Sequence, residues 1–373
     1  MWLCGPSALT DPVSTSRRLV YPYWFLFGLF AVGALFCVPD FRFEKRLGSL
    51  WIGAIVLTLF IGLRYWTGVD WNNYFMTWKA AGFMTLPAFL QNRGGDPAFY
   101  TLLWVLRGAG LEYWLLNLTC AAIFTTGLVC FAKRLPNPWL AAFVGVPYLG
   151  IVIAMSGTRQ ATAIGFVFLA LLAFFKSRLK AFLAWSAIGA LFHASALITV
   201  PLAALSYARS FLQQMVLIAA TAALAYFALS ARIEMYADRY GEASQLLLQS
   251  SGTSYRIAML VLAAIAYVAF VAPSVATEPH ERTLWRNYSI ASLAAIPLFF
   301  VVPSTTSLDR LLLYAYPLQI FALGMLPYAL LKVRPALVML GIIAYFGITM
   351  WVFFTFAENA ESYIPYQAYG FHL

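Results

Sequence analysis

Long apolar runs separated by short polar connections dominate the chain. A helix needs roughly 20 apolar residues to cross the hydrocarbon core of a bilayer. The runs long enough to do so are 19–38, 48–65, 112–131, 138–154, 160–175, 211–229, 255–273, 287–303, 311–331 and 336–356. The pattern predicts an all-α polytopic membrane protein with about ten transmembrane helices.

Two further apolar stretches do not fit a simple crossing. The stretch 98–108 is short and contains Arg107, which is typical of an interfacial helix. The stretch 181–205 is long enough to cross once, but it contains His193 near its middle and Pro201 near its end. It is either one transmembrane helix or a bent hairpin that enters and leaves on the same side.

Composition supports a single integral membrane domain over 1–373. Hydrophobic residues make up 62% of the chain and charged residues 10%, whereas about a quarter of the residues of a soluble domain are charged. The two long polar connections are 66–97 and 230–254, and the second has the pattern of an amphipathic surface helix or a lid. The four cysteines and three histidines lack the spacing of a metal site, so we expect no metal or other cofactor.

The positive charges predict the orientation of the helices. Lys and Arg concentrate in short cytoplasmic connections of membrane proteins. If 39–47 is cytoplasmic and 181–205 is a hairpin, most Lys and Arg of the short connections lie inside, whereas a single crossing divides them about evenly. The charges therefore favour the hairpin, with 66–97 and 230–254 outside. The net charge of +10 is accounted for by this topology and by anionic ligands, and we expect no nucleic-acid partner.

The first polar cluster lies at the predicted outer end of the second span. Arg64 closes this span, and Asp70 follows in a short turn rich in Trp and Tyr. Arg64 is either a membrane anchor or an anion ligand. Aromatic faces around a carboxylate are typical of sugar sites, and burial among them would raise the pKa of Asp70 towards that of a useful base.

Two hydroxyl-rich segments precede helices that begin on the outside. In the segment Ser156–Gln160, Ser156 or Thr158 is expected to cap a helix beside Arg159. In the segment Ser304–Arg310, a hydroxyl run is followed by an acid in the first helical turn, Asp309, and by an outward-facing Arg310. Positive helix ends next to arginines suit a diphosphate, although a capped helix with a snorkelling arginine explains each segment as well.

Two more residues are candidates. His193 lies inside an apolar run, where ionisable side chains are costly and often functional, but a structural hydrogen bond at a helix kink would also explain it. Asp96 precedes Pro97 and forms either a turn or a sugar contact.

The order of these motifs along the chain is informative. The motifs are Arg64, Gly68-x-Asp70-aromatic-x-x-Tyr74, Asp96-Pro97-Ala98-Phe99, Ser156-x-x-Arg159-Gln160 and Phe192-His193-x-Ser195-Ala196. Together they resemble the EpsG-like family, relatives of the Wzy-type bacterial polysaccharide polymerases. The resemblance runs through these motifs from about residue 50 to 205, and beyond them through helix number and Arg310. The family usually has Glu-Pro-Gly where this chain has Asp96-Pro97-Ala98.

The resemblance implies a metal-independent glycosyl transfer at the outer face of the bacterial cytoplasmic membrane. Donor and acceptor would be undecaprenyl-diphosphate-linked oligosaccharides, and a chain-length regulator protein is a further expected partner beside membrane lipid. Asp70 or His193 would act as the base, with Asp70 preferred. The expected substrate-binding residues are Arg64, Tyr74, Asp96, Arg159, Gln160, Asp309 and Arg310.

Three other functions remain open from the sequence. A membrane acyltransferase that modifies surface glycans would need a route for a cytoplasmic thioester donor. A lipid-linked-glycan flippase or transporter is expected to carry charges at mid-membrane and to show repeats, and neither feature is evident. A transferase that adds single sugars is barely distinguishable from a polymerase.

Overall fold

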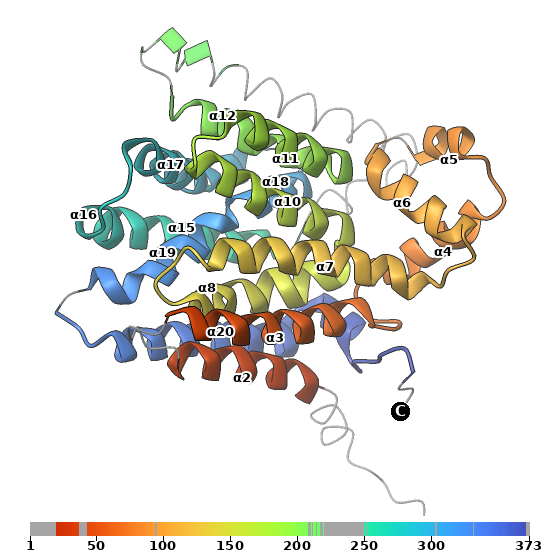
Figure 1. Ribbon diagram of the computed structural model, residues 1–373, viewed down its shortest axis with the longest axis horizontal. Helices are drawn as coiled ribbons and strands as arrows, with labels where there is room; N and C mark the ends of the chain where they lie inside the picture. Colours follow the sequence, from red (N-terminus) through yellow and green to blue (C-terminus); the bar gives the residue numbers. More distant parts are fainter. Residues whose placement is uncertain are drawn as a thin grey trace, which may run out of the picture.

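The computed structural model is an all-helical bundle (Figure 1). It describes residues 20–36, 43–93, 95–207, 210, 212–213, 215–216, 219, 250, 252–302, 304–330 and 332–370, with only the backbone described for 43–47. The predicted amphipathic segment 230–254 lies outside the described residues except for 250 and 252–254.

The first part of the chain forms the helices that precede and include the predicted hairpin. They are α2 (Tyr21–Phe36), α3 (Phe43–Gly62), α4 (Trp71–Ala81), α5 (Leu86–Arg93), α6 (Pro97–Gly108), α7 (Tyr113–Ala132), α8 (Pro138–Gly145), the π-helical η1 (Val146–Ile153), α9 (Ala154–Ser156), α10 (Thr158–Phe175), α11 (Leu179–Phe192), η2 (Ala194–Ile198) and α12 (Thr199–Ala204). The predicted short helix at 98–108 is α6, and the polar connection 66–97 contains α4 and α5.

The second part completes the bundle. Its elements are α15 (Thr253–Ala266), the π-helical η4 (Tyr267–Val271), α16 (Ala272–Ser274), α17 (Pro279–Val301), α18 (Thr305–Leu312), η5 (Leu313–Ala315), α19 (Tyr316–Ala329), α20 (Pro335–Phe356) and η6 (Glu358–Tyr363).

Seven helical segments in the described part of the chain are long and apolar enough to cross a membrane. They are Tyr113–Ala132, Pro138–Ser156, Thr158–Phe175, Thr253–Ser274, Pro279–Val301, Thr305–Ala329 and Pro335–Phe356. The shorter apolar helices are Tyr21–Phe36, Gly48–Gly62, Leu179–Phe192 and Ala194–Ala204. The protein is thus a polytopic membrane protein, as predicted. Every predicted span coincides with a helix except 211–229, most of which is outside the described residues.

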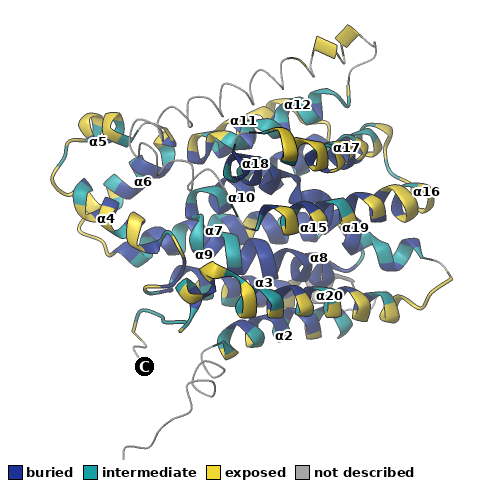
Figure 2. Cartoon of the chain, turned by 180° about the vertical axis from the view of Figure 1, so that it is seen from behind, coloured by how far each residue is buried: buried dark blue, intermediate teal, exposed yellow. Residues whose placement is uncertain are grey.

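The core of the bundle is formed by α8, η1, α10 and α19, which Figure 2 shows mostly buried. In the most apolar window of Pro138–Ser156, 83% of the residues are buried. In that of Pro335–Phe356 only 33% are buried, although this segment is more hydrophobic. The outer helices expose large apolar side chains such as Phe25, Ile348 and Trp351. Such exposure is stable in lipid, because lipid tails are as apolar as these side chains.

The bundle has two chemically different ends (Figure 1). At the loop end lie α4, α5, α6 and the C-terminal segment, together with the first residues of α10 and α18. At the basic end lie the connections that contain Lys133–Arg134, Lys176–Arg178 and Lys332–Arg334. The arginines predicted to share one side of the membrane, at positions 64, 159 and 310, are all at the loop end.

The stretch 181–205 is a hairpin, as predicted. The chain runs through α11, turns at His193 and returns through η2 and α12. Tyr207, which follows α12, contacts the rings of Phe174 and His280 at the basic end. The Leu202 carbonyl accepts a hydrogen bond from Asn287 Nδ2 at 3.1 Å. Both ends of the hairpin therefore lie at the basic end and its turn lies at the loop end.

Two details of helix starts differ from the prediction. Gly157, rather than Ser156 or Thr158, is at the N-cap of α10, and no side chain caps this helix. The Thr158 hydroxyl accepts a hydrogen bond from Arg64 instead. Ser304 caps α18 as expected, since its Oγ accepts from the Ser307 backbone N–H at 3.2 Å. This helix begins six residues earlier than the predicted run 311–331, so Asp309 lies beyond the first turn.

Candidate functional site

Arg159 is the second residue of α10 and lies at the loop end. Its Nη1 donates to Asp96 Oδ2 at 2.6 Å and to the Tyr100 hydroxyl at 3.2 Å, and its Nε donates to the Tyr74 hydroxyl at 3.2 Å. The side chain is 27% exposed. Because the guanidinium is planar, three acceptors fix its orientation, which a lysine ammonium could not reproduce. Arg159 is therefore held in place and remains partly accessible.

Asp96 joins Arg159 to the turn of the hairpin. It has a left-handed backbone conformation, with φ 51° and ψ 51°, directly before Pro97 at the start of α6. Its Oδ1 accepts a hydrogen bond from the Ala194 backbone N–H at 3.3 Å, while Oδ2 binds Arg159. A non-glycine residue in this conformation is uncommon and needs support from its surroundings. Asp96 thus acts as a brace between α6, α10 and the hairpin.

Asp70 occupies the N-cap position of α4, but its side chain does not cap the helix. Burial raises the pKa of the Asp70 carboxyl, while the positive charges of Arg159 and Arg310 and a hydrogen bond with the Asn73 side chain offset part of the rise. Three segments far apart in the sequence therefore meet at one carboxylate. A half-buried carboxylate with a raised pKa and adjacent arginines is equipped to accept a proton beside an anion.

Arg310 and Asp309 are neighbours in α18 but have different partners. Arg310 is half-buried and its charge acts on Asp70. Asp309 forms an ion pair with Arg256 of α15. Consecutive residues of a helix point about 100° apart, so one helix presents the two side chains to two different places.

His193 lies at the turn of the hairpin. It is 2% exposed, and its Nδ1 is 3.2 Å from the hydroxyl of Tyr314, which follows Arg310 by one helical turn. The neighbouring residue, Ala194, contacts Asp96. The turn therefore places His193 beside the Arg159 cluster, although it lies within a continuous apolar run of the sequence.

Tyr74 and Gln160 flank Arg159. Burial raises the pKa of Tyr74 to about 12, against the opposing charge of Arg159, so its hydroxyl stays protonated and can donate a hydrogen bond. Gln160 is half-buried, and a Cβ on Gly157 would lie 2.7 Å from its amide oxygen. The amide of Gln160 thus lies over the glycine that precedes α10.

Arg64 lies behind this cluster and is fully buried. Its Nη1 donates to the Ile61 carbonyl at 2.6 Å. Its Nη2 donates to Asn117 Oδ1 at 3.2 Å and to the Thr158 hydroxyl at 2.8 Å. These neutral acceptors tie together the ends of α3, α7 and α10. The structure thus brings Asp70, Tyr74, Asp96, Arg159 and Arg310 together and buries Arg64 behind them.

The C-terminal strap, residues 357–370, lies over the Asp70 turn and was not predicted from the sequence. Its backbone bonds to that turn are Tyr65 N–H to Gln367 O at 2.8 Å, Gly68 N–H to Ser362 O at 2.7 Å and Tyr369 N–H to Leu63 O at 2.8 Å. The sequence signal that could have indicated the strap is a tyrosine at every third position, 363, 366 and 369. The Tyr363 hydroxyl donates to the Val152 carbonyl at 2.7 Å, and Tyr366 stacks on Phe60. The strap holds the turn that carries Asp70.

A cavity of 440 Å³ lies at the basic end, away from this cluster. It is bounded by the α7–α8 connection, the α16–α17 connection and α19, and its charged lining residues are Arg134, Glu278 and Glu281. None of the predicted site residues lines it. Within the described residues, no three His, Cys, Asp or Glu side chains lie close enough together to hold a metal ion.

Comparison with known proteins identifies the family. A family model described as the EpsG family matches residues 50–368, which include the Asp70 turn, the hairpin and most of the C-terminal strap. No curated protein sequence and no solved structure matches the chain. The matched region covers most of the sequence and all of the clustered residues. The chain therefore belongs to the EpsG family, which is associated with exopolysaccharide biosynthesis.

Proposed function

We propose that this protein is a polysaccharide polymerase of the Wzy type. It joins oligosaccharide repeat units carried on undecaprenyl diphosphate, without a metal ion, at the outer face of the bacterial cytoplasmic membrane. The observation that carries the proposal is the Asp70 carboxylate beside the charges of Arg159 and Arg310. Because each of the three residues lies at the end of a different helical segment, the bundle itself fixes their relative positions.

The proposed reaction forms one bond and breaks one. A hydroxyl of the acceptor sugar attacks the anomeric carbon of the donor chain, and the bond between that carbon and the diphosphate oxygen breaks. The hydroxyl proton passes to Asp70. A positioned general base of this kind accelerates a reaction by about 10²–10⁴. The diphosphate leaves with the electron pair of the broken bond.

Arg159 and Arg310 would stabilise the leaving diphosphate. A diphosphate gains negative charge as its bond to the sugar breaks, and a guanidinium already held in position needs no reorganisation at that moment. Asp96, Tyr74 and Tyr100 hold Arg159 in this way. Part of the Arg159 guanidinium remains exposed for the ligand.

The remaining predicted residues take supporting roles. His193 is 2% exposed and close to the Tyr314 hydroxyl, which favours Asp70 as the base and gives His193 a positioning role beside Arg310. Arg64 anchors the start of α10 through Thr158. Gln160 and Tyr74 are close enough to Arg159 to bind sugar hydroxyls or phosphate.

The orientation of the protein in the membrane is inferred from the distribution of its positive charges. Lysines are concentrated at the basic end, which supports a cytoplasmic location for that end. The loop end, with Asp70 and Arg159, would then face the exterior, where lipid-linked units are polymerised.

The test is complementation of a gene deletion, with surface and lipid-linked glycans separated on gels. Asp70→Asn and Arg159→Ala should accumulate single repeat units in place of long chains. Glu281→Gln, a carboxylate change at the basic end, is the matched control and should restore long chains. Full-length chains lacking acyl groups would indicate an acyltransferase, lipid-linked units trapped inside would indicate a flippase, and repeats lacking one sugar would indicate a single-sugar transferase.

A further inference from the structure

The ion pair between Arg256 and Asp309 lies on a different side of α18 from Arg310. Arg256 is the fourth residue of α15, and its Nη1 also donates to Ser250 Oγ at 3.2 Å. A Cβ on Gly252 would lie 2.8 Å from Arg256 Nη2, so this glycine leaves room for the guanidinium. The Arg256 side chain is 23% exposed and that of Asp309 is 9% exposed.

Two buried polar atoms beside this pair have no hydrogen-bond partner. One is Asp309 Oδ1, the carboxylate oxygen that Arg256 does not bind, and the other is the Tyr148 hydroxyl. Arg256 and Tyr316 are the polar neighbours of that hydroxyl and interact with it electrostatically, but neither reaches the distance and angle of a full hydrogen bond. Leaving a buried polar group unpaired is energetically unfavourable. Two such atoms next to one arginine indicate that a ligand supplies the missing hydrogen bonds.

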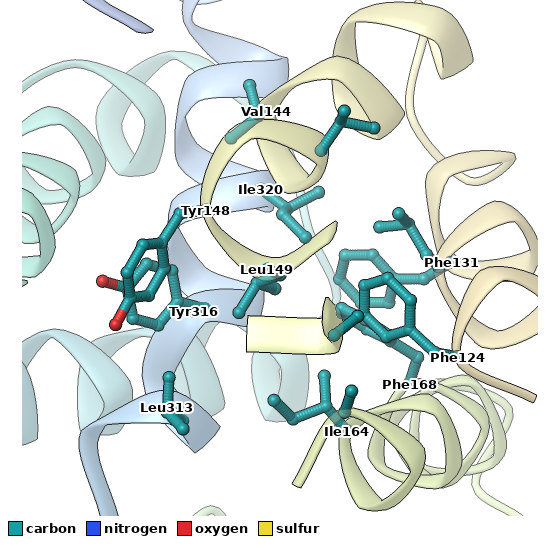
Figure 3. Close-up of a cluster of buried hydrophobic side chains, with 14 of the residues drawn as sticks. Phe124, Phe131, Val144, Tyr148, Leu149, Ile164, Phe168, Leu313, Tyr316 and Ile320 are labelled. Atoms are coloured by element: carbon teal, nitrogen blue, oxygen red, sulfur yellow. The ribbon is translucent and has the colours of Figure 1, made fainter. Parts of the chain in front are cut away.

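Tyr148 is held by an unusual piece of backbone. It belongs to η1, a π-helical segment that continues α8 through the core, and π-helical segments occur frequently at functional sites. Its ring stacks on that of Tyr316, with ring centroids 4.7 Å apart and planes 23° apart. Figure 3 shows both hydroxyl groups projecting to the same side of the stacked pair.

The chemistry of these atoms selects the ligand. A carboxylate oxygen only accepts hydrogen bonds, so its missing partner must donate one. The diphosphate of a lipid-linked glycan, esterified at both ends, carries no proton at neutral pH and would be repelled by Asp309. A sugar hydroxyl both donates and accepts, and it can therefore satisfy Asp309 Oδ1 together with Tyr148 or Arg256.

We infer that Arg256, Tyr148 and Asp309 form a subsite for the hydroxyl groups of a sugar residue, separate from the arginines proposed to bind the diphosphate. The inference rests on the proposed function, because it assigns the glycan and the diphosphate to two parts of one site. Tyr363 links the two parts, since its hydroxyl interacts electrostatically with both Asp70 and Tyr148. The sugar subsite and Asp70 are thus both within electrostatic reach of one tyrosine.

Equilibrium dialysis of the purified full-length protein in lipid nanodiscs tests the subsite. The two probes are inorganic diphosphate and the radiolabelled, phosphate-free repeat oligosaccharide released by mild acid from the lipid carrier of the deletion strain. Tyr148→Phe removes a hydroxyl that forms no full hydrogen bond within the protein, so folding should be preserved. We expect it to raise the Kd for the oligosaccharide about three- to tenfold, as the loss of one hydrogen bond would, and to leave the Kd for diphosphate unchanged.

The matched control is Tyr288→Phe. The Tyr288 hydroxyl is also buried without a partner, but its ring packs against Trp285 in α17 rather than near Arg256. This variant should change neither Kd, and Arg159→Lys should weaken diphosphate binding alone. Unchanged oligosaccharide binding in Tyr148→Phe, a lost affinity for diphosphate in that variant, or no oligosaccharide binding by the wild type would each overturn the subsite.

The binding measurement and the gene complementation together keep the two proposals distinguishable. The proposed function is tested by the appearance of long chains when the wild-type gene complements the deletion. If long chains form and Tyr148→Phe binds the oligosaccharide normally, the subsite fails and the polymerase stands. If no long chains form but Tyr148→Phe loses oligosaccharide affinity, the subsite stands as a glycan site of a protein with another activity.

Discussion

Two arginine–carboxylate pairs lie at opposite ends of the bundle, and they have different surroundings. At the basic end, Arg134 Nη2 is 3.0 Å from Glu281 Oε2, and the Arg134 guanidinium lies 3.9 Å from the centroid of the Phe175 ring. The second Glu281 oxygen accepts from Trp285 Nε1 at 3.2 Å. Both partners at this end are therefore engaged with each other and with aromatic rings.

At the loop end the corresponding pair is part of a larger charged group. Arg159 binds Asp96 and two tyrosine hydroxyls. The positive charges of Arg159 and Arg310 both lower the pKa of Asp70, against the rise caused by burial. Asp96 is held in a left-handed backbone conformation. An ion pair in a membrane bundle is therefore not by itself a functional site. The additional titratable groups and the strained support distinguish the loop end from the basic end.

Removal of the Asp70 charge should produce the largest difference between the two ends. Asp70→Asn keeps the shape of the side chain but cannot accept the proton, so the polymerisation rate of the purified protein should fall by about 10²–10⁴. Glu281→Gln removes a charge at the basic end and keeps an oxygen for Trp285, so the rate should change less than twofold. Equal losses in the two variants would remove the distinction between the ends.

Lysine substitutions compare the two arginines directly. Arg159→Lys keeps the positive charge but cannot hold Asp96 and the two tyrosines in a single plane, so the rate should fall by about 10²–10³, as when one preorganised donor is lost. Arg134→Lys should retain most of the rate, because that pair lies at the basic end, away from Asp70. Rates are measured on lipid-linked repeat units, with thermal unfolding as the control for folding. Full activity of Arg159→Lys would show that its geometry is unimportant.

Two glycine substitutions compare the backbone of the two ends. Gly68 has φ +102°, and a Cβ there would overlap the Met155 carbonyl oxygen, so Gly68→Ala should displace the Asp70 turn. We expect a destabilisation of about 1–3 kcal/mol with a lower polymerisation rate. Gly341 lies near the basic end of α20 with open space around it, and Gly341→Ala should be stabilising by about 0.5–1 kcal/mol. Thermal unfolding of both variants and the wild type in one detergent measures the two changes in stability.

Most of the fold could be predicted because a bilayer imposes signals that are local in the sequence. The length of each apolar run predicted the spans, and the position of Lys and Arg predicted the hairpin at 181–205. The start of α10 was predicted less well, since a distant residue competes for the capping group. The Thr158 hydroxyl accepts from Arg64, 94 residues earlier, rather than capping α10.

The sequence indicated some members of the cluster around Asp70 but not their pairings. Arginines and acids at helix ends indicated Asp70, Arg159 and Arg310 as residues with a common role. The sequence could not show that Asp96 pairs with Arg159, because the two belong to separate helices that only the tertiary fold brings together. It also could not show that Arg64 is completely buried, since snorkelling and burial have the same sequence pattern at the end of a span.

The pH dependence should give the smallest effect and tests the Asp70 environment. The base is active when deprotonated, so the rate falls as the pH drops through the pKa of Asp70, which burial raises above its ordinary value. Asn73 is exposed, and its hydrogen bond lowers that pKa. Asn73→Ala should therefore move the acid limb of the rate profile to higher pH by less than about one unit and leave the alkaline rate unchanged. Arg282→Ala, a substitution beside Glu281 at the basic end, should not move the profile. A shift to lower pH in Asn73→Ala would contradict the assignment of Asp70 as the base.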